Sequence, residues 1–203
     1  MKTSILKHTR TASTVIIVIL FSISLWQLAE AGWIQCKAII AQQLLDYSWQ
    51  QTLDEKESDN KTSTFKPWPW SDTWPAAKLL VPQHGIEQII LAGDSGSSLA
   101  FAPGYSLAGA VPNMPGTTII TAHRDTHFRF LRDLKIGDAI YLQTTDRTVR
   151  YQVYDFQVVD SKSYTVLPSH HEQTLVLATC YPFDAMTSGG ALRYLVFANR
   201  KPV

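Results

Sequence analysis

The chain has 203 residues, 45% of them hydrophobic, which is enough for one compact domain and an accessory segment. Lys2, Lys7 and Arg10 are three of its 18 basic residues and precede every acidic one, which leaves 15 basic against 17 acidic residues beyond them. This near-neutral balance gives no support for nucleic-acid binding.

An uncharged apolar segment follows the basic N-terminus. Residues 12–29 contain no charged side chain, and as a helix they extend about 27 Å, close to the hydrocarbon thickness of a bilayer. We therefore expect a transmembrane anchor over residues 12–31, after a cytoplasmic tail at 1–11. A cleaved signal peptide has the same basic start, and small residues at 29–32 leave cleavage open, but this apolar run is longer than a usual signal-peptide core.

The charges around this segment predict its orientation. Basic residues stand before it and Glu30 follows it, so the positive-inside rule keeps the N-terminus in the cytoplasm and exports the rest. We expect a single-pass protein of the cytoplasmic (inner) membrane with an extracytoplasmic domain, which is periplasmic if the cell is Gram-negative.

A stalk and linker are expected over residues 32–66. Ile40, Leu44 and Tyr47 recur at i, i+4 and i+7 among polar residues, which predicts an amphipathic stalk or docking helix. Residues 54–66 are polar, charged and aperiodic, which is typical of a linker.

The remaining domain, residues 67–203, begins with a segment rich in proline and tryptophan, PWPWSDTWPAAKLLVP. Because this segment is too stiff and aromatic for a tether, we expect it to dock on the edge of the domain, with an aromatic-lined ligand groove as the alternative. Beyond it, short β-rich runs alternate with glycine-containing turns, which predicts an all-β barrel or sandwich. The expected strands are residues 87–92, 117–123, 139–144, 148–160, 174–181 and 193–199.

Three chemically interesting side chains stand at the ends of these strands. Cys180 closes an apolar run just before Tyr181-Pro182, His123 ends another, and Arg193 opens the last. Cysteine catalysis needs a thiolate, a histidine or other cation beside it, and a donor to the oxyanion, and these residue types meet those needs. Taken singly, each fits a plainer role equally well: a core thiol, a packed or surface histidine, and a solvated arginine.

Other local patterns favour different chemistry but fail on order or composition. The run Gly93-Asp94-Ser95-Gly96 is similar to the serine loop of trypsin-like proteases, yet in that family the histidine comes before the serine. His123 and His127 have the i, i+4 spacing of helical zinc ligands, but residue 124 is arginine where a zinc protease needs glutamate. We expect no metal and no cofactor, and GDSGSS is interpreted as a turn.

Cys36 is the only other cysteine. It lies just past the membrane segment, far along the chain from Cys180, and we expect it to be an interfacial packing residue and not a disulfide partner.

Together, the two longest motifs resemble the sortase family. The string TAHRDTHFRFLRDLKIGDAIYL, residues 121–142, is similar to the signature in which histidine, arginine and aspartate end a strand ahead of a Lys-x-Gly-Asp turn. The string TLVLATCYPF, residues 174–183, resembles a second signature ending in Thr-Cys, and Arg193 stands thirteen residues after the cysteine, where the family has its arginine. One departure is Ala122, where family members commonly have glycine.

This resemblance covers residues 68–203 and is closest to the single-pass sortases of Gram-negative (marine proteobacterial) type, which share the Pro-Trp-rich lead-in. It implies a closed eight-stranded β-barrel with short helices, in which His123, Cys180 and Arg193 converge on a groove. Thr179, directly before the cysteine, is a candidate for substrate contacts.

The implied reaction is transpeptidation. Cys180 attacks the threonine carbonyl of an LPxTG-like sorting signal at the C-terminus of an exported protein, and an unidentified amine acceptor then resolves the thioester. The resemblance implies that His123 acts as general acid and base and that Arg193 stabilises the oxyanion or aligns the substrate.

Two other functions stay open at this point. An L,D-transpeptidase also joins Cys, His and Arg on a β scaffold, but it carries an arginine almost directly after the cysteine, where this chain has Tyr-Pro-Phe. A membrane-tethered β-domain that binds peptides without catalysis fits the composition equally well. The presence of all three residue types at motif positions favours the enzyme.

Overall fold

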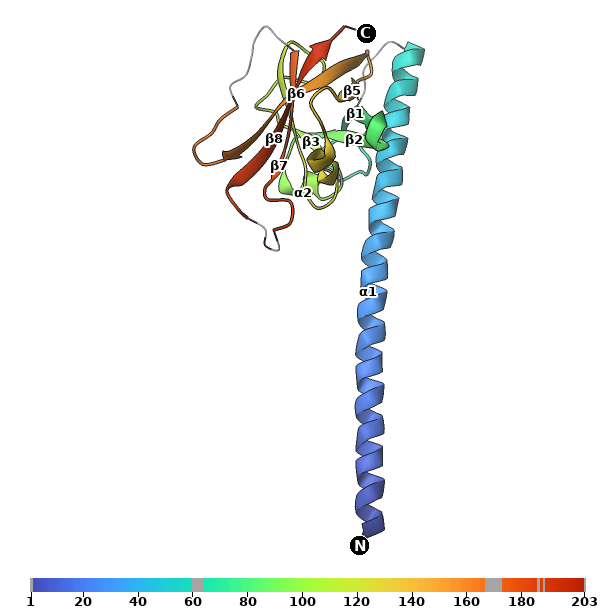
Figure 1. Cartoon of the computed structure of the whole chain (residues 1–203). Coiled ribbons are helices and arrows are strands. Elements are labelled where there is room, and N and C mark those ends of the chain that lie inside the picture. Colours follow the sequence, from blue (N-terminus) through green and yellow to red (C-terminus); the bar gives the residue numbers. More distant parts are fainter. Residues whose placement is uncertain (1, 60–63, 167–172, 186, 188, 203) are drawn as a thin grey trace. The chain divides into compact units, whose positions relative to one another are not determined.

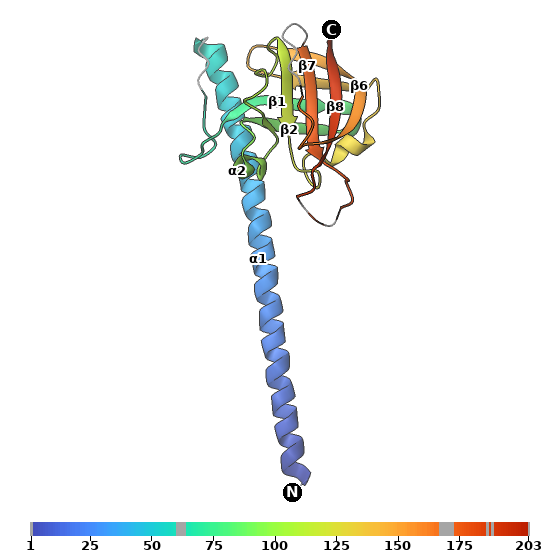
Figure 2. The same ribbon diagram turned by 90° about the vertical axis from the view of Figure 1, so that its left-hand side faces the viewer.

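The computed structural model describes residues 2–59, 64–166, 173–185, 187 and 189–202, and Figures 1 and 2 show its elements. The chain divides into two compact units, Met1–Ala41 and Gln42–Val203. The helices are α1 Lys2–Asp59, η1 Pro82–His84, α2 Gly96–Leu99 and η2 Arg129–Asp133. The strands are β1 Pro75–Val81, β2 Ile86–Ala92, β3 Gly104–Tyr105, β4 Gly116–Thr121, β5 Ala139–Gln143, β6 Thr148–Asp160, β7 Gln173–Cys180 and β8 Leu192–Lys201.

The N-terminal unit contains the first part of α1, up to Ala41. By length and composition this helix contains a candidate membrane span near the N-terminus, within Ile17–Ser58, and its apolar side chains from Ile17 to Leu28 are exposed. α1 continues to Asp59, so the first residues of the linker expected at 54–66 are helical. Glutamate and lysine are good helix formers, and Lys56 also forms an ion pair with Asp146 at 3.1 Å. The linker residues 60–63 lie outside the described part of the chain.

The end of α1 packs on the barrel within the second unit. Leu45 and Trp49 are buried in one cluster with Ile89 and Leu91 of β2 and with Ala102. The side-chain amide of Gln42 also donates to the carbonyl of Phe101. These contacts make the last turns of α1 part of the domain.

The buried side of this helix differs from the side expected from the sequence. The buried residues are Leu45, Ser48, Trp49 and Thr52, at i, i+3, i+4 and i+7. Leu44 is 37% exposed and Tyr47 63% exposed, so the predicted stripe was wrong in its residues. The i, i+4, i+7 pattern passed over Trp49, which has the largest side chain in this stretch. Ser48 and Thr52 are tolerated there because their hydroxyls donate to α1 carbonyls at 3.0 and 2.9 Å.

The second unit is a closed barrel with the strand order β1-β2-β3-β4-β7-β8-β6-β5, which confirms the expected all-β, eight-stranded fold with short helices. The pairs β2 with β3 and β4 with β7 are parallel, and the other six are antiparallel. Six strands fall on the runs expected from the sequence. β1 lies in the Pro-Trp-rich segment, where apolar residues at both inward and outward positions hide the period of two, and β3 has only two residues.

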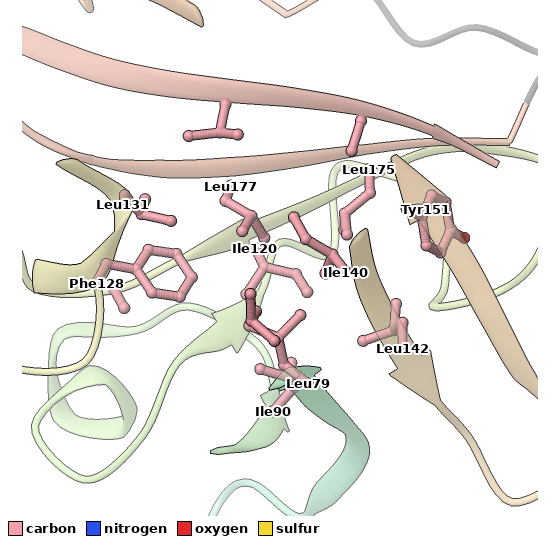
Figure 3. Close-up of a cluster of buried hydrophobic side chains, with 14 of the residues drawn as sticks. Leu79, Ile90, Ile120, Phe128, Leu131, Ile140, Leu142, Tyr151, Leu175 and Leu177 are labelled. Carbon is pink, nitrogen blue, oxygen red and sulfur yellow. The ribbon is translucent and has the colours of Figure 1, made fainter. Parts of the chain in front are cut away.

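Inward side chains from the strands fill the barrel (Figure 3). Phe128 and Leu131, at and just inside the start of η2, belong to the same buried cluster and are both fully buried. Burying a side chain of this size contributes about 1.5–3 kcal/mol, so the cluster holds the strand ends in place. The fully buried strand residues labelled in Figure 3 are Leu79, Ile90, Ile120, Ile140, Leu142, Tyr151, Leu175 and Leu177.

The Pro-Trp-rich segment docks on the barrel, as expected. Trp68 packs edge-to-face on Phe101 with ring centroids 5.0 Å apart, and Trp74 packs against the core. The buried hydroxyl of Thr73 donates to the carbonyl of Ala92 at 2.7 Å. The GDSGSS stretch, expected to be a turn, instead starts α2, because the Ser95 hydroxyl caps this helix by accepting from the Ser98 amide.

Candidate active site

The strand register brings the three predicted site residues to one end of the barrel. β7 and β8 are antiparallel, and Cys180 at the end of β7 lies directly opposite Arg193 of β8. β4 runs parallel to β7 with Thr121 opposite Ala178. β4 ends at Thr121, so His123 follows it after one residue, at the end of the barrel that carries Cys180. The ends of β4 and β7 and the start of β8 therefore meet.

These residues share the outer face of the sheet. Side chains alternate between the two faces of a strand, so the residues two and four positions before Cys180 point the same way as its thiol. Beyond the end of β4, Ala122 belongs to the barrel core, whereas its neighbour His123 is exposed. An apolar outer cluster continues this face away from Cys180 and Arg193. It contains Ile119, Val159, Val166, Val176, Ala178, Leu195 and Phe197.

The side chains of the three residues differ in exposure and contacts. Cys180 is a free, half-buried thiol, and His123 is exposed. Arg193 is half-buried, and its Nη1 donates to the carbonyls of Gly190 at 2.6 Å and Leu192 at 2.9 Å. Among the described residues, Nε and Nη2 of Arg193 have no partner, so these nitrogens can donate to a ligand. The arrangement offers a nucleophile, a proton carrier and a cationic donor on one face.

Thr179 is directed inward. Its side chain is 3% exposed, and its hydroxyl donates to the carbonyl of Ala122 at 2.7 Å. The Ala122 amide in turn donates to Ala178 at 3.3 Å. The sequence made Thr179 a candidate for substrate contacts, but its hydroxyl instead joins the end of β7 to the residue that precedes His123.

An aromatic group that the sequence reading did not identify lies behind the site. Tyr194 stacks on Tyr181 and on Phe156, with ring centroids 6.2 and 6.0 Å apart, and meets Phe183 edge-on at 5.2 Å. Burial, followed by the neighbouring Tyr181, raises the pKa of Tyr194 above its usual value. Because Tyr194 follows Arg193 and Tyr181 follows Cys180, these rings brace both strands from the inner side.

His127 lies close to the site but faces a different environment. It is half-buried, and its carbonyl accepts from the side-chain amide of Gln88 at 2.9 Å. Burial, and then the charge of His123, hold the pKa of His127 below its usual value. His127 is therefore biased toward the neutral imidazole.

The residues that follow His123 and Cys180 in the chain line a pocket of about 220 Å³. Its lining is mostly charged, with Phe183 as the apolar member. The charged lining residues are Arg124, Asp125, Arg129, Arg132 and Asp184.

The sortase domain family model matches residues 79–201, and the chain belongs to the sortase family. It is 29% identical to sortase D of Bacillus subtilis (strain 168) over 146 residues, which are 71% of each chain. Family membership supports a transpeptidase function.

Solved structures agree on the fold. Sortase A from Corynebacterium diphtheriae is 25% identical with a TM-score of 0.58, and the match covers 66% of this chain and 64% of that one. The chain thus spans just under two thirds of that sortase A. The sortase D5 transpeptidase of Clostridium perfringens matches with a TM-score of 0.64 over 80% of this chain and 99% of its own, at 20% identity, a likeness of fold alone.

Proposed function

We propose that this protein is a membrane-anchored sortase that cleaves an LPxTG-like signal at the C-terminus of an exported protein and transfers the acyl part to an amine. One observation carries the proposal: the register sets Cys180 opposite Arg193 on the outer face of a sortase barrel, and β4, which ends two residues before His123, runs beside β7.

The proposed chemistry has two steps. The Cys180 thiolate attacks the threonine carbonyl carbon, the peptide C–N bond breaks, and protonated His123 gives its proton to the departing amine, which leaves a thioester. An incoming amine then attacks the thioester carbon and gives a proton to His123, and the thiolate is released. Arg193 donates to the oxyanion that forms in each step. Water in place of the amine gives hydrolysis.

The outer apolar cluster is the proposed contact surface for the leucine and proline of the signal. It lies on the face that carries Cys180, and Ala178 is only two residues from the thiol. Apolar side chains at this position can bury the signal while the polar residues act on its backbone.

The proposed location is the outer side of the cytoplasmic membrane. The apolar candidate span and the basic residues before it support a cytoplasmic tail at 1–11, a span at 12–31, a stalk and linker at 32–66 whose last helical turns pack on the barrel, and a catalytic domain at 67–203. The Pro-Trp-rich lead-in supports the Gram-negative subtype, with a periplasmic domain.

The test uses the full-length protein in detergent and a quenched fluorescent LPxTG peptide, with and without an added glycine amine. Cys180→Ala should abolish cleavage, while the matched control Cys36→Ala, at the exposed second cysteine, should cleave like the wild type. Mass spectrometry should detect the thioester on Cys180 and an amine-ligated product. Peptide binding without turnover in the wild type would favour the non-catalytic binding domain, and undiminished turnover in Cys180→Ala would refute the cysteine mechanism.

A further inference from the structure

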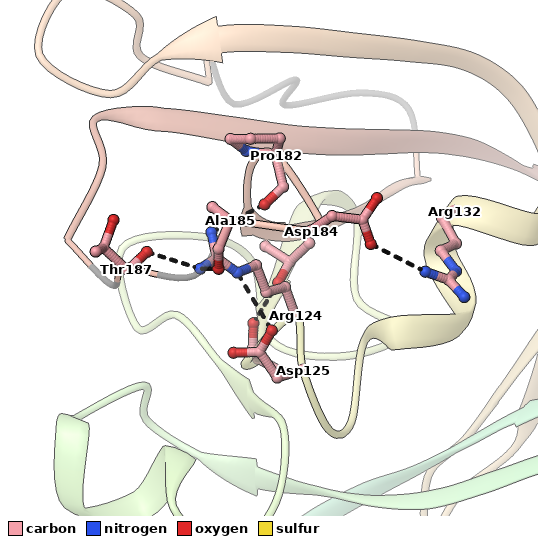
Figure 4. Close-up of polar contacts among 9 residues, drawn as sticks. Arg124, Asp125, Arg132, Pro182, Asp184, Ala185 and Thr187 are labelled. Atoms are coloured by element: carbon pink, nitrogen blue, oxygen red, sulfur yellow. Dashed lines mark hydrogen bonds and ion pairs between the residues drawn. The ribbon is translucent and has the colours of Figure 1, made fainter.

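Arg124, the residue directly after His123, is buried to an extent unusual for a charged side chain. It is 6% exposed (Figure 4). Its Nη1 donates to the carbonyl of Pro182 at 2.9 Å, and its Nη2 donates to those of Ala185 and Thr187 at 2.8 and 2.9 Å. One guanidinium therefore binds three backbone carbonyls of the connection between β7 and β8.

Ion pairing does not account for this burial. The only carboxylate that contacts Arg124 in the described part of the chain is Asp125, 3.3 Å from Nε, and the Asp125 side chain is 71% exposed. Water screens such a pair, whereas removing the guanidinium from water carries a large desolvation cost. The backbone carbonyls must compensate for that cost, and only a planar fork with fixed donors reaches all three.

The segment that Arg124 holds connects two of the proposed catalytic residues. The β7–β8 connection begins after Cys180 and ends before Arg193, and the Tyr181 amide donates to Leu192 at 3.0 Å. Arg193 holds the far end of this connection through Gly190. Arg124 holds its near half and is itself bonded to His123 through the backbone. A shift of the connection would therefore change the surface that a peptide substrate meets between Cys180 and Arg193.

We propose that Arg124 is a positioning residue of the active site, which fixes the β7–β8 connection in the conformation that receives the peptide substrate. This role rests on the proposed sortase function. Arg124 itself does not touch the reacting atoms. It acts through Pro182, Ala185 and Thr187, and it keeps Phe183 and Asp184 in the wall of the pocket that it lines.

The test compares Arg124→Met with Arg132→Met in the full-length protein. Methionine keeps the length of the side chain and removes its donors. Arg132 lines the same pocket, and in the described part of the chain its polar contacts are the exposed carboxylates of Asp133 and Asp184, at 3.9 and 3.6 Å. It therefore controls for the loss of one positive charge. Both variants are made in a Cys36→Ala background, so that a thiol reagent reports on Cys180 alone.

Three measurements are made well below the melting temperature. Hydrogen exchange of residues 181–192 should be faster in Arg124→Met and unchanged in Arg132→Met. With the LPxTG peptide, kcat/KM should fall about 10- to 100-fold in Arg124→Met, because the substrate is no longer held in the reactive position, and should stay within about twofold in Arg132→Met. The iodoacetamide alkylation rate of Cys180 and its pH profile should match the wild type in both, because His123 and Arg193 remain.

Arg124→Lys gives a second variant for the case in which methionine prevents folding. Its ammonium keeps the charge but lacks the planar fork, so it should recover only part of the lost kcat/KM.

Three results would overturn the positioning role. The first is an equal loss of kcat/KM in Arg124→Met and Arg132→Met, and the second is faster loop exchange with unchanged turnover. The third is an altered alkylation pH profile, which would mean that Arg124 acts on the thiol itself. Failure of the proposed function looks different. In that case the wild type and Cys180→Ala are equally inert toward the peptide, while loop exchange still decides whether Arg124 holds the connection.

Discussion

Replacing Thr179 with valine removes one buried hydroxyl and leaves the side-chain volume nearly unchanged. In the native protein this hydroxyl donates to the carbonyl of Ala122 at 2.7 Å. Ala122 precedes His123, and Thr179 precedes Cys180, so the bond joins the two chain segments that present the proposed base and nucleophile. The substitution therefore tests whether a hydrogen bond inside the barrel controls the geometry outside it.

The expected loss follows from burial on both sides of the bond. Thr179 is 3% and Ala122 6% exposed, so the orphaned carbonyl gains no ready access to water. Leaving a buried acceptor without a donor costs about 1–3 kcal/mol. For a domain of this size each kcal/mol lowers the melting temperature by about 2–4 °C, so Thr179→Val should melt about 2–12 °C below the wild type. Because the residue before His123 then loses one of its hydrogen bonds to β7, kcat/KM should also fall by about tenfold.

Tryptophan fluorescence of the full-length protein in detergent follows unfolding, and the peptide cleavage assay follows catalysis. Thr179→Ser is the matched control, since it keeps the donor and should stay close to the wild type in both assays. If valine and serine variants melt together, the bond does not hold the strand ends. If valine lowers the melting temperature but leaves kcat/KM unchanged, the link from this bond to His123 is wrong.

Two further predictions concern the docked helix and the pH dependence of stability. Trp49→Ala should lower the free energy of unfolding by about 3–5 kcal/mol, because Trp49 is 1% exposed in the cluster that joins α1 to β2. The control Tyr47→Ala, on the exposed side, should change the urea midpoint little. Equal effects of the two substitutions would contradict the assigned buried face. Burial, and then the charge of His123, lower the pKa of His127 from its usual 6.5. Below about pH 6.5 the unfolded chain therefore binds more protons than the folded one. The free energy of unfolding falls as the pH drops toward the lowered pKa. The urea midpoint should therefore fall between about pH 7.5 and pH 5, by less in His127→Gln than in the wild type; the same fall in both would rule out this contribution.

Most of the fold could be predicted from local pattern. Apolar or alternating runs predict the strands β4, β6, β7 and β8. The uncharged segment at 12–29 predicts a span by its length. β1 and β3 were missed from pattern because one has apolar residues on both faces and the other has two residues. The helix after the span was expected, but its buried side was not, since Leu44 and Leu45 are equally apolar and only contact with β2 selects between them.

The candidate site divides in the same way. Motif spacing predicted His123, Cys180 and Arg193 as the candidate site residues. A second signal was that each stands at the end of a recognisable strand. Their positions relative to one another depend on the pairing of β4 with β7 and of β7 with β8. The β4–β7 pairing joins residues more than fifty positions apart in the chain.

The sequence by itself determined the family, the residue types of the site and their order along the chain, since these are properties of short contiguous motifs. Only the tertiary structure decided that Thr179 faces inward and that Arg124 is buried. Arg124 follows a strand and precedes an aspartate, a setting in which an arginine is usually solvated. Its acceptors at Pro182, Ala185 and Thr187 lie about sixty residues away. A buried charge is stable only where such distant carbonyls converge on it, and no local pattern encodes that convergence.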